Sequence, residues 1–437
     1  MVSLKSTTAR YRRLLPWHRL AVCCALLANV TVSAQAESGS APDRQAMRTW
    51  IEQLDARSFA TRRRASRLLA DAGQHAIPLL VESCQRAEPE VIERIIFILE
   101  QNTLGTDLTK SRQAARALHQ IAQADWASSS RAKRAIQRYR VKRRNWIIAY
   151  LESKGGKVEQ NIHRGNMTLD LRLLRSWSGG VRDLELVAEL EGIKSLMLEG
   201  TWLTDEGLKY LRDNPDLSQL VIGPSRVTAA GLRHLATCPK LSTLILTQLR
   251  LPQESLIALQ SFPALTDLNL LGSPISDDAL VQLGALENIE RLNLSRTRIT
   301  DAGLVHLQKM TKLQTLAIQQ TSTAGPGIAA LNQCPNLKDL SLKGVHFPAD
   351  SVQHLATLTR LHTLRLEDTN LLDEDMQHLT GLDKLRVLWL SKVQITDAAV
   401  KHLQQLGELK QLFLHGSQIT EAGATKLRET VKFGVYR

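Results

Sequence analysis

The chain has 437 residues, of which 43% are apolar and 23% are charged, a composition typical of domains that bury a core. This composition excludes a disordered chain, a collagen-like chain and a membrane protein with many spans. The net charge is +13, but residues 166–437 carry 28 basic and 29 acidic side chains, so the excess lies in the N-terminal third. The charge therefore does not predict specific nucleic-acid binding by the whole chain.

The first 36 residues have the order of a secretory signal peptide. A basic stretch (1–19) precedes an apolar run (20–32), and the small-x-small triplet Ala34-Gln35-Ala36 follows. The apolar run has 13 residues, fewer than the roughly 20 that span a bilayer as a helix. We expect cleavage after Ala36 and export to the periplasm, the cell envelope or the medium, with no transmembrane span remaining. An uncleaved anchor or a merely hydrophobic N-terminus is the alternative.

Residues 37–155 are predicted to form a helical domain. Ser58 is placed to cap a helix, and Pro89 is placed to open another. Two further helices are expected at about 109–124 and 130–152, from their apolar spacing.

Within this domain, residues 58–80 resemble one HEAT-type repeat. Arg and Ala lie in a first helix, Gly73 ends it, and Ile77-Pro78 opens the second. A junction is expected at 156–165, where Gly155-Gly156 breaks the preceding helix.

The last of the predicted helices is strongly basic. One interpretation is a surface that binds an anionic envelope polymer or a membrane surface. The other is a solvated helix face beside the buried Ile136, Ile147 and Ile148. The basic positions are Arg131, Lys133, Arg134, Arg138, Arg140, Lys142, Arg143 and Arg144.

Residues 166–437 contain a repeat with a strict period. An L-x-L core recurs every 24 residues from Leu196 to Leu412, and an earlier core at Leu169 precedes it by 27 residues. In four repeats a branched residue, then Thr or Ser and an acid follow the core, as in Ile299-Thr300-Asp301. The Thr hydroxyl can cap a following helix, and an acid in the first turn suits the helix dipole. The pattern predicts that each repeat consists of a strand, a turn, a short helix and a segment that returns to the next strand.

These residues match a leucine-rich repeat protein. The L-x-x-L-x-L core with I-T-D-x-G-L, complete in 292–304, resembles the ribonuclease-inhibitor-like superfamily, bacterial secreted repeat proteins and the repeat half of F-box receptors. The resemblance implies an α/β solenoid of about eleven repeats, with a parallel sheet on the concave side and helices on the convex side.

The chain offers no constellation that points to catalysis or metal binding. Cleavage after Ala36 would leave three of the five cysteines, Cys84, Cys238 and Cys334. Their number is odd and they form no C-x-x-C, so neither a disulfide framework nor a zinc site is predicted. Five His residues share one phase of the repeat but have no acidic or Cys partner in register. No P-loop, kinase or hydrolase signature occurs. We therefore predict no enzyme, cofactor, metal or catalytic residue.

The outward residue of each core forms a column on the concave face. It is apolar early (Met197, Val221, Ile245), small and polar in the middle, and aromatic late, where Trp389 and Phe413 follow Arg365. Exposed aromatics beside an Arg are common binding residues. The alternatives are that the late aromatics cover the end of the array together with 431–436, and that the early patch packs against the helical domain.

The sequence thus predicts an exported, non-enzymatic scaffold that binds a protein or peptide on its concave face. The second hypothesis is a structural envelope component bound to an anionic polymer or membrane through the basic helix at 131–144. The third is a substrate-recognition subunit similar to F-box receptors, although no F-box-like segment is evident.

Overall fold

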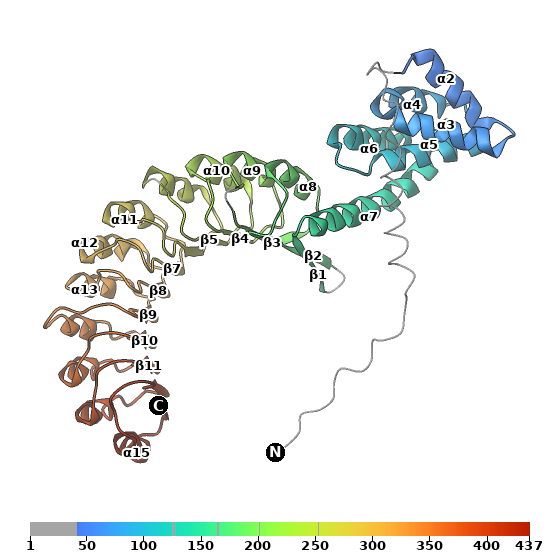
Figure 1. Cartoon of the computed structure of the whole chain (residues 1–437). Helices are drawn as coiled ribbons and strands as arrows, with labels where there is room; N and C mark the ends of the chain where they lie inside the picture. The colour runs from blue at the N-terminus through green and yellow to red at the C-terminus, as the bar shows by residue number, and fades with distance from the viewer. Residues whose placement is uncertain (1–41, 125, 127, 164–165, 201, 252) are drawn as a thin grey trace, which may run out of the picture. The chain divides into compact units, whose positions relative to one another are not determined.

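A computed structural model describes residues 42–124, 126, 128–163, 166–200, 202–251 and 253–437. The predicted signal peptide lies outside these residues. The chain forms two compact units, of which one ends at Tyr139 and the other begins at Arg140 (Figure 1).

The first unit is entirely helical in its described part. Ser58 Oγ accepts a hydrogen bond from the Thr61 amide, as its predicted cap role requires. Pro89 is the first residue of its helix, where its missing amide hydrogen costs nothing. The elements are α2 (Arg44–Glu52), η1 (Gln53–Asp55), α3 (Phe59–Asp71), η2 (Gly73–His75), α4 (Ile77–Ser83), α5 (Pro89–Asn102), α6 (Leu108–Gln123) and α7 (Ser129–Ser153).

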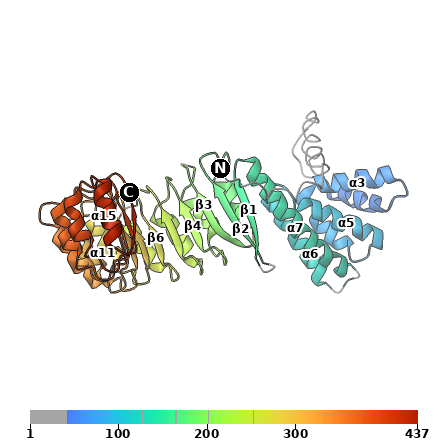
Figure 2. The same ribbon diagram turned by 90° about the horizontal axis from the view of Figure 1, so that it is seen from below.

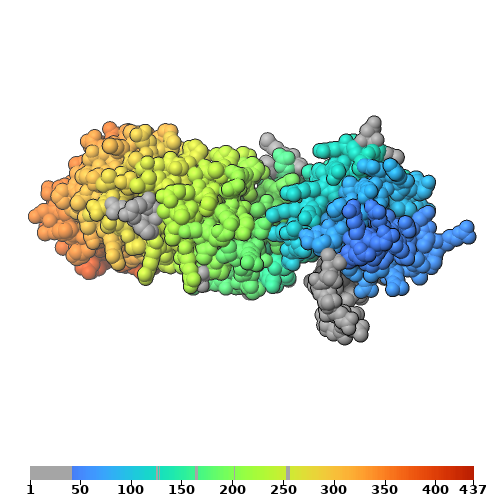
Figure 3. Space-filling model, turned by 90° about the horizontal axis from the view of Figure 1, so that it is seen from above, coloured from blue at the N-terminus to red at the C-terminus, as the bar shows by residue number. Residues whose placement is uncertain are grey.

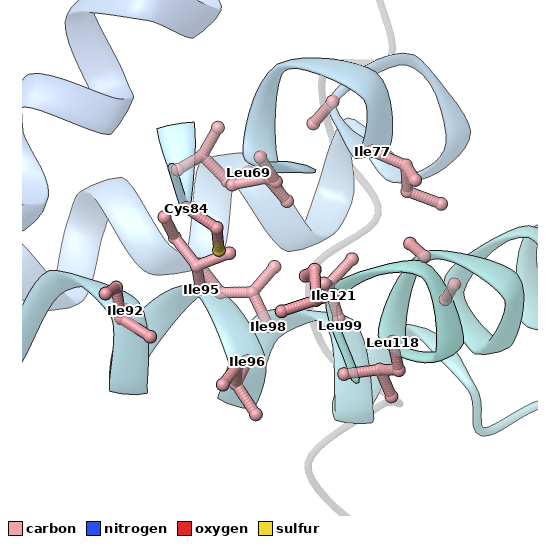
Figure 4. Close-up of a cluster of buried hydrophobic side chains, with 14 of the residues drawn as sticks. Leu69, Ile77, Cys84, Ile92, Ile95, Ile96, Ile98, Leu99, Leu118 and Ile121 are labelled. Atoms are coloured by element: carbon pink, nitrogen blue, oxygen red, sulfur yellow. The ribbon is translucent and has the colours of Figure 1, made fainter. Parts of the chain in front are cut away.

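Aliphatic side chains from α3 to α6 fill one core in this unit. Figure 4 shows Leu69 of α3, Ile95 and Leu99 of α5 and Leu118 of α6 converging from three helices. All four are fully buried, so the apolar spacing of each helix is satisfied on one face.

α7 belongs partly to each unit. In the second unit, Arg143 Nε donates to Glu189 Oε2 at 2.9 Å, and the Tyr150 hydroxyl donates to Asp183 Oδ1 at 2.9 Å. Burial, and then the Asp183 carboxylate, raise the pKa of Tyr150 to about 12. These bonds hold the C-terminal part of α7 against the segment that precedes β3.

The second unit is built on one sheet of 13 strands that follow chain order. β1 pairs with β2 antiparallel, and every later pair is parallel. β1 lies within the predicted junction. Figure 2 shows β1 to β4 side by side. The strands are β1 (Lys157–His163), β2 (Asn166–Leu173), β3 (Ile193–Leu198), β4 (Gln219–Ile222), β5 (Thr243–Leu246), β6 (Asp267–Asn269), β7 (Arg291–Asn293), β8 (Thr315–Ala317), β9 (Asp339–Ser341), β10 (Thr363–Arg365), β11 (Val387–Trp389), β12 (Gln411–Phe413) and β13 (Gly434–Tyr436).

The sheet lines the concave side of this unit, and short helices line the convex side (Figure 1). Successive repeats follow one another along its surface (Figure 3). The main helical segments are α8 (Leu184–Val187), α9 (Asp205–Leu208), α10 (Ala229–Arg233), η6 (Gln253–Ser261), α11 (Asp277–Leu283), α12 (Asp301–Leu304), α13 (Gly327–Ala330), η9 (Val352–Thr357), η10 (Asp373–Leu379), α14 (Val400–Leu403) and α15 (Glu421–Thr430).

The 24-residue register is confirmed. Leu196 pairs with Leu220, Leu268 with Leu292, and so on to Leu412. These inward leucines are buried, while the residues between them face the concave surface. Each repeat therefore buries its leucines only by stacking on its neighbours.

The I-T-D-x-G-L motif has a structural role that joins one repeat to the next. Asp277 accepts hydrogen bonds from the Thr300 amide at 2.7 Å and the Thr300 hydroxyl at 2.6 Å. The Thr300 hydroxyl also accepts from the Ala302 amide, which confirms its predicted cap role. A Cβ on Gly303 would lie 2.4 Å from Asp277 Oδ1, so only glycine allows this approach.

The same bridge recurs between Asp205 and Thr228, Asp373 and Thr396, and Asp397 and Thr420. It is interrupted at Asp301, because Ala324 stands where the next Thr would be. Asp301 Oδ2 accepts from the Gly325 amide at 2.8 Å, but Oδ1 is covered and has no partner among described residues. Burial raises the pKa of Asp301, whereas the bonds from Thr420 lower that of Asp397.

Candidate ligand-binding site

The late concave face carries a continuous stack of planar side chains. The rings of Trp389 and Phe413 lie 3.7 Å apart and 9° from parallel, and those of Phe413 and Tyr436 lie 4.8 Å apart and 14° from parallel. The Arg365 guanidinium carbon lies 5.1 Å from the centre of the Trp389 ring. We call these four residues the ring stack. They occupy one column of β10, β11, β12 and β13.

Parallel register produces this arrangement. Side chains at the same position of adjacent strands lie about 4.8 Å apart, close to the distance between the centres of two stacked rings. Arg365 pairs with Trp389, Trp389 with Phe413, and Phe413 with Tyr436. Flat side chains at four successive positions therefore stack face to face.

Tyr436 is the member of the ring stack that the sequence analysis missed. The strand step from Gln411 to Gly434 is 23 residues, not 24, so a period search places Tyr436 out of phase. The available signal was that the segment 431–436, which the sequence pattern offers as a cover for the end of the array, contains an aromatic residue.

The C-terminal segment does cover the last repeat. β13 adds a strand to β12, with Val435 buried and the Leu414 amide donating to the Tyr436 carbonyl at 2.7 Å. The ring stack nevertheless stays accessible, because Tyr436 is 48% exposed and Arg365 is exposed. Covering the array and presenting aromatics are thus compatible here.

Polar atoms beside the ring stack are incompletely paired. Trp389 Nε1 and Glu367 Oε2 are covered and have no hydrogen-bond partner among the described residues. One is a donor and the other an acceptor, on adjacent repeats. Such groups are costly to leave unpaired.

The edge of the sheet next to the ring stack is cationic. Lys338, His362, Arg386 and Lys410 each directly precede the strands β9 to β12. We call them the cationic row. Desolvation and the charges of Arg386 and Lys338 lower the pKa of His362, so His362 is neutral at pH 7 and the other three members carry the charge of the row. Their 24-residue spacing was the signal that the sequence analysis did not use.

The other predicted concave residues lie elsewhere on the sheet. Met197, Val221 and Ile245 lie in β3, β4 and β5, all partly exposed, and the structure does not bring them next to the ring stack. Between the two zones, a hollow of about 240 Å³ opens over β5 to β8, beside an Asp267–Arg291 ion pair. Asn269 and Asn293 line it, and each uses its side-chain oxygen to accept a backbone amide at 2.9 Å.

The basic helix is partly neutralised. Arg131 pairs with Glu93 at 2.9 Å, Arg138 with the buried Glu100 at 2.5 Å, and Arg143 with Glu189 at 2.9 Å. Lys133, Arg134, Arg140 and Lys142 are exposed, and Arg144 is partly buried. The eight basic residues therefore do not act as one free surface.

Three further observations concern other kinds of site. Within residues 42–437, apart from the few positions left undescribed, no group of three or more His, Cys, Asp and Glu side chains is placed to hold a metal ion. Over the same residues, no helix has both the length and the apolarity needed to cross a membrane. Cys84, Cys238 and Cys334 are free and buried, and burial raises the pKa of Cys334 to about 11.

Comparison with known proteins found relatives only among solved structures. No family model matches the chain, and no curated protein matches it. An internalin from Listeria monocytogenes is 17% identical over 66% of this chain and 86% of that one, with a TM-score of 0.45. Internalin C2 from the same species is 25% identical over 50% and 84%, with a TM-score of 0.36. A leucine-rich repeat protein from Leptospira interrogans is 16% identical over 58% and 80%, also with a TM-score of 0.36.

These TM-scores are too low to support conclusions about this chain. The assignment rests on the chain's own features: inward leucines at a 24-residue period, a parallel sheet in strict register, and helices on the opposite side. The second unit is therefore a leucine-rich repeat solenoid.

Proposed function

We propose that the protein is an exported, non-enzymatic recognition scaffold whose concave face binds a protein or peptide at the ring stack. The observation that supports this most is the alignment of Arg365, Trp389, Phe413 and Tyr436 on four adjacent strands. Large aromatic side chains and Arg dominate binding energies at protein interfaces, particularly where they are rigid before binding.

The side chains of the ring stack are rigid before a ligand binds. Each ring is held by its neighbour and by a strand whose inward leucines are buried, so little side-chain entropy remains to be lost on binding. Stacked aromatic pairs add about 0.5–1.5 kcal/mol per pair beyond burial of area when their rings are offset. The face is therefore preorganised for a ligand.

The proposal is tested by selecting ligands from a random peptide library displayed on phage. The full chain serves as bait, and a Trp389→Leu, Phe413→Leu variant serves for comparison. A matched control, Ile257→Ser with Val281→Ser, removes two exposed apolar side chains from the convex helices. Each variant is first checked by circular dichroism and thermal melting.

We expect the wild type and the convex control to enrich the same peptides, and the ring-stack variant to lose them. Peptides that bind all three proteins equally would contradict the proposal. Export is a separate part of it, and N-terminal sequencing of the protein from its host would show whether Glu37 begins the mature chain.

A second candidate is attachment to an anionic envelope polymer or membrane through α7. The exposed Lys133, Arg134 and Arg140 favour it, whereas the three ion pairs reduce it. Binding to anionic vesicles that falls steeply with salt, and falls again in a Lys133→Gln, Arg134→Gln, Arg140→Gln variant, would support this candidate.

A further inference from the structure

The two central rings of the ring stack expose their edges rather than their faces. Arg365 and Phe413 cover the two faces of Trp389, and Trp389 and Tyr436 cover those of Phe413. An aromatic ring carries partial negative charge on its face and partial positive charge at its edge. A ligand on the concave side therefore meets positive ring edges, the Arg365 guanidinium and the Tyr436 hydroxyl.

The buried ring faces also limit the kind of ligand. Sugars bind aromatic side chains mainly by laying their C–H groups on a ring face, and here both faces of the two central rings are occupied. Acceptor groups that approach ring edges in the plane, such as carboxylates and carbonyls, fit the exposed geometry better.

The charges on the late strands also favour a ligand with acceptor groups. Four windows of six residues, each beginning at a member of the cationic row, together hold five Lys and Arg residues and two acids. The six equivalent windows of the earlier repeats together hold two Lys and Arg residues and three acids. The late set is Lys338, Lys343, Arg365, Arg386 and Lys410 with Asp339 and Glu367; the early set is Lys194 and Arg291 with Glu199, Asp267 and Glu290.

Four of these five cations are not neutralised by described residues. Lys338, Arg365, Arg386 and Lys410 are all exposed. None of the four forms an ion pair with a described residue. In the early half, by contrast, Arg291 is paired with Asp267. The positive potential of the late face is therefore available to a partner.

We infer that the partner segment is an acidic polypeptide, whose carboxylates contact the cationic row while its backbone or side chains contact the edges of the ring stack. This inference rests on the proposed function, since it names the ligand class of the same face. Extended chain rises about 3.3 Å per residue, so roughly five residues cross the ~14 Å from β9 to β12. The partner segment is short.

The test uses three labelled peptides of about eight residues, alternating Ser with Glu, Gln or Lys, and fluorescence anisotropy with the full chain. A Lys338→Gln, Arg386→Gln, Lys410→Gln variant removes the row. The matched control, Lys309→Gln, Lys401→Gln, Lys426→Gln, removes the same charge from exposed positions on the helical side. An oligogalacturonate tests an acidic sugar chain.

We expect the Glu peptide to bind, the Gln and Lys peptides to bind at least about tenfold more weakly, and added salt to weaken binding. The row variant should lose about tenfold in affinity and the control less than about twofold. Equal losses in both variants would mean that net charge alone matters and would overturn the inference. Oligogalacturonate binding in preference to the Glu peptide would also overturn it.

Failure here is distinguishable from failure of the proposed function. If library peptides depend on the ring stack but are not enriched in Asp and Glu, and the row variant binds them normally, the recognition face stands and the acidic partner does not. If ring-stack and convex-control variants select the same peptides, the recognition face itself is wrong.

Discussion

The early and late parts of the concave sheet share one scaffold and differ in what they present. Leu220 in β4 and Leu388 in β11 are both fully buried at the same phase of the repeat. Their outward neighbours are Val221 and Trp389, and the residues that precede their strands are Ser218 and Arg386. The inward positions therefore determine the fold in both halves, while the outward positions determine what each half can bind.

The comparison predicts equal stability effects at inward positions. Leu244→Ala, Leu294→Ala and Leu388→Ala should each lower the free energy of unfolding by about 2–5 kcal/mol, because each leaves a cavity between neighbouring repeats. Urea unfolding of the three variants measures this. A shift of only a few tenths of a kcal/mol at one position would show that the register is wrong there.

The Asp–Thr bridge predicts unequal effects at equivalent positions. Asp277→Ala should cost about 1.5–3 kcal/mol, since the carboxylate accepts two hydrogen bonds from Thr300. Asp301→Ala should cost less than about 1 kcal/mol, because one oxygen is covered and unpaired and burial raises the pKa of this carboxyl. Equal costs in chemical unfolding would mean that the bridge adds nothing.

Within the outward column, the late residues should be more strongly coupled in energy than the early ones. A double-mutant cycle with Trp389→Leu and Phe413→Leu should give a coupling energy of about 0.5–1.5 kcal/mol, from the stacked pair. The equivalent cycle with Val221→Ser and Ile245→Ser should give a smaller coupling. A larger coupling in the early pair would reverse the assignment of rigidity to the late face.

The smallest difference between the halves is expected for their cysteines. Cys238 and Cys334 are buried and donate to the Leu211 and Leu307 carbonyls, both at 3.4 Å. Burial raises the pKa of both thiols, in Cys334 to about 11, so neither forms much thiolate at pH 8. Peptide mapping after alkylation should show both reacting far more slowly in the native chain than in urea. Rapid labelling of one alone would indicate local opening of its repeat.

The sequence predicts features that follow from a local pattern and misses those that depend on a partner in another repeat or on a break in the period. The phase of Leu196 to Leu412, the caps at Ser58 and Thr300 and the helix start at Pro89 all follow from local patterns, and the structure confirms them. Tyr436 was missed because the last step is one residue short. The role of Asp277 was missed because its partner, Thr300, lies in the next repeat.

The ring stack itself was only partly predictable. Trp389, Phe413 and Arg365 share a column by simple counting, but their face-to-face packing depends on side-chain rotation, which a sequence pattern does not specify. The cationic row was equally countable, yet its meaning depends on the absence of ion pairs with described neighbours, which only the structure shows.

The most direct test of the account measures one selected peptide by calorimetry against three forms of the full chain. These are the wild type, the late variant Trp389→Leu, Phe413→Leu and the early variant Val221→Ser, Ile245→Ser. Since loss of a dominant contact costs at least about 2 kcal/mol, the account predicts that the late variant binds roughly 30-fold more weakly, and the early variant within about twofold of the wild type. Equal losses in both variants, or a loss in the early variant alone, would contradict the claim that recognition resides in the late concave face.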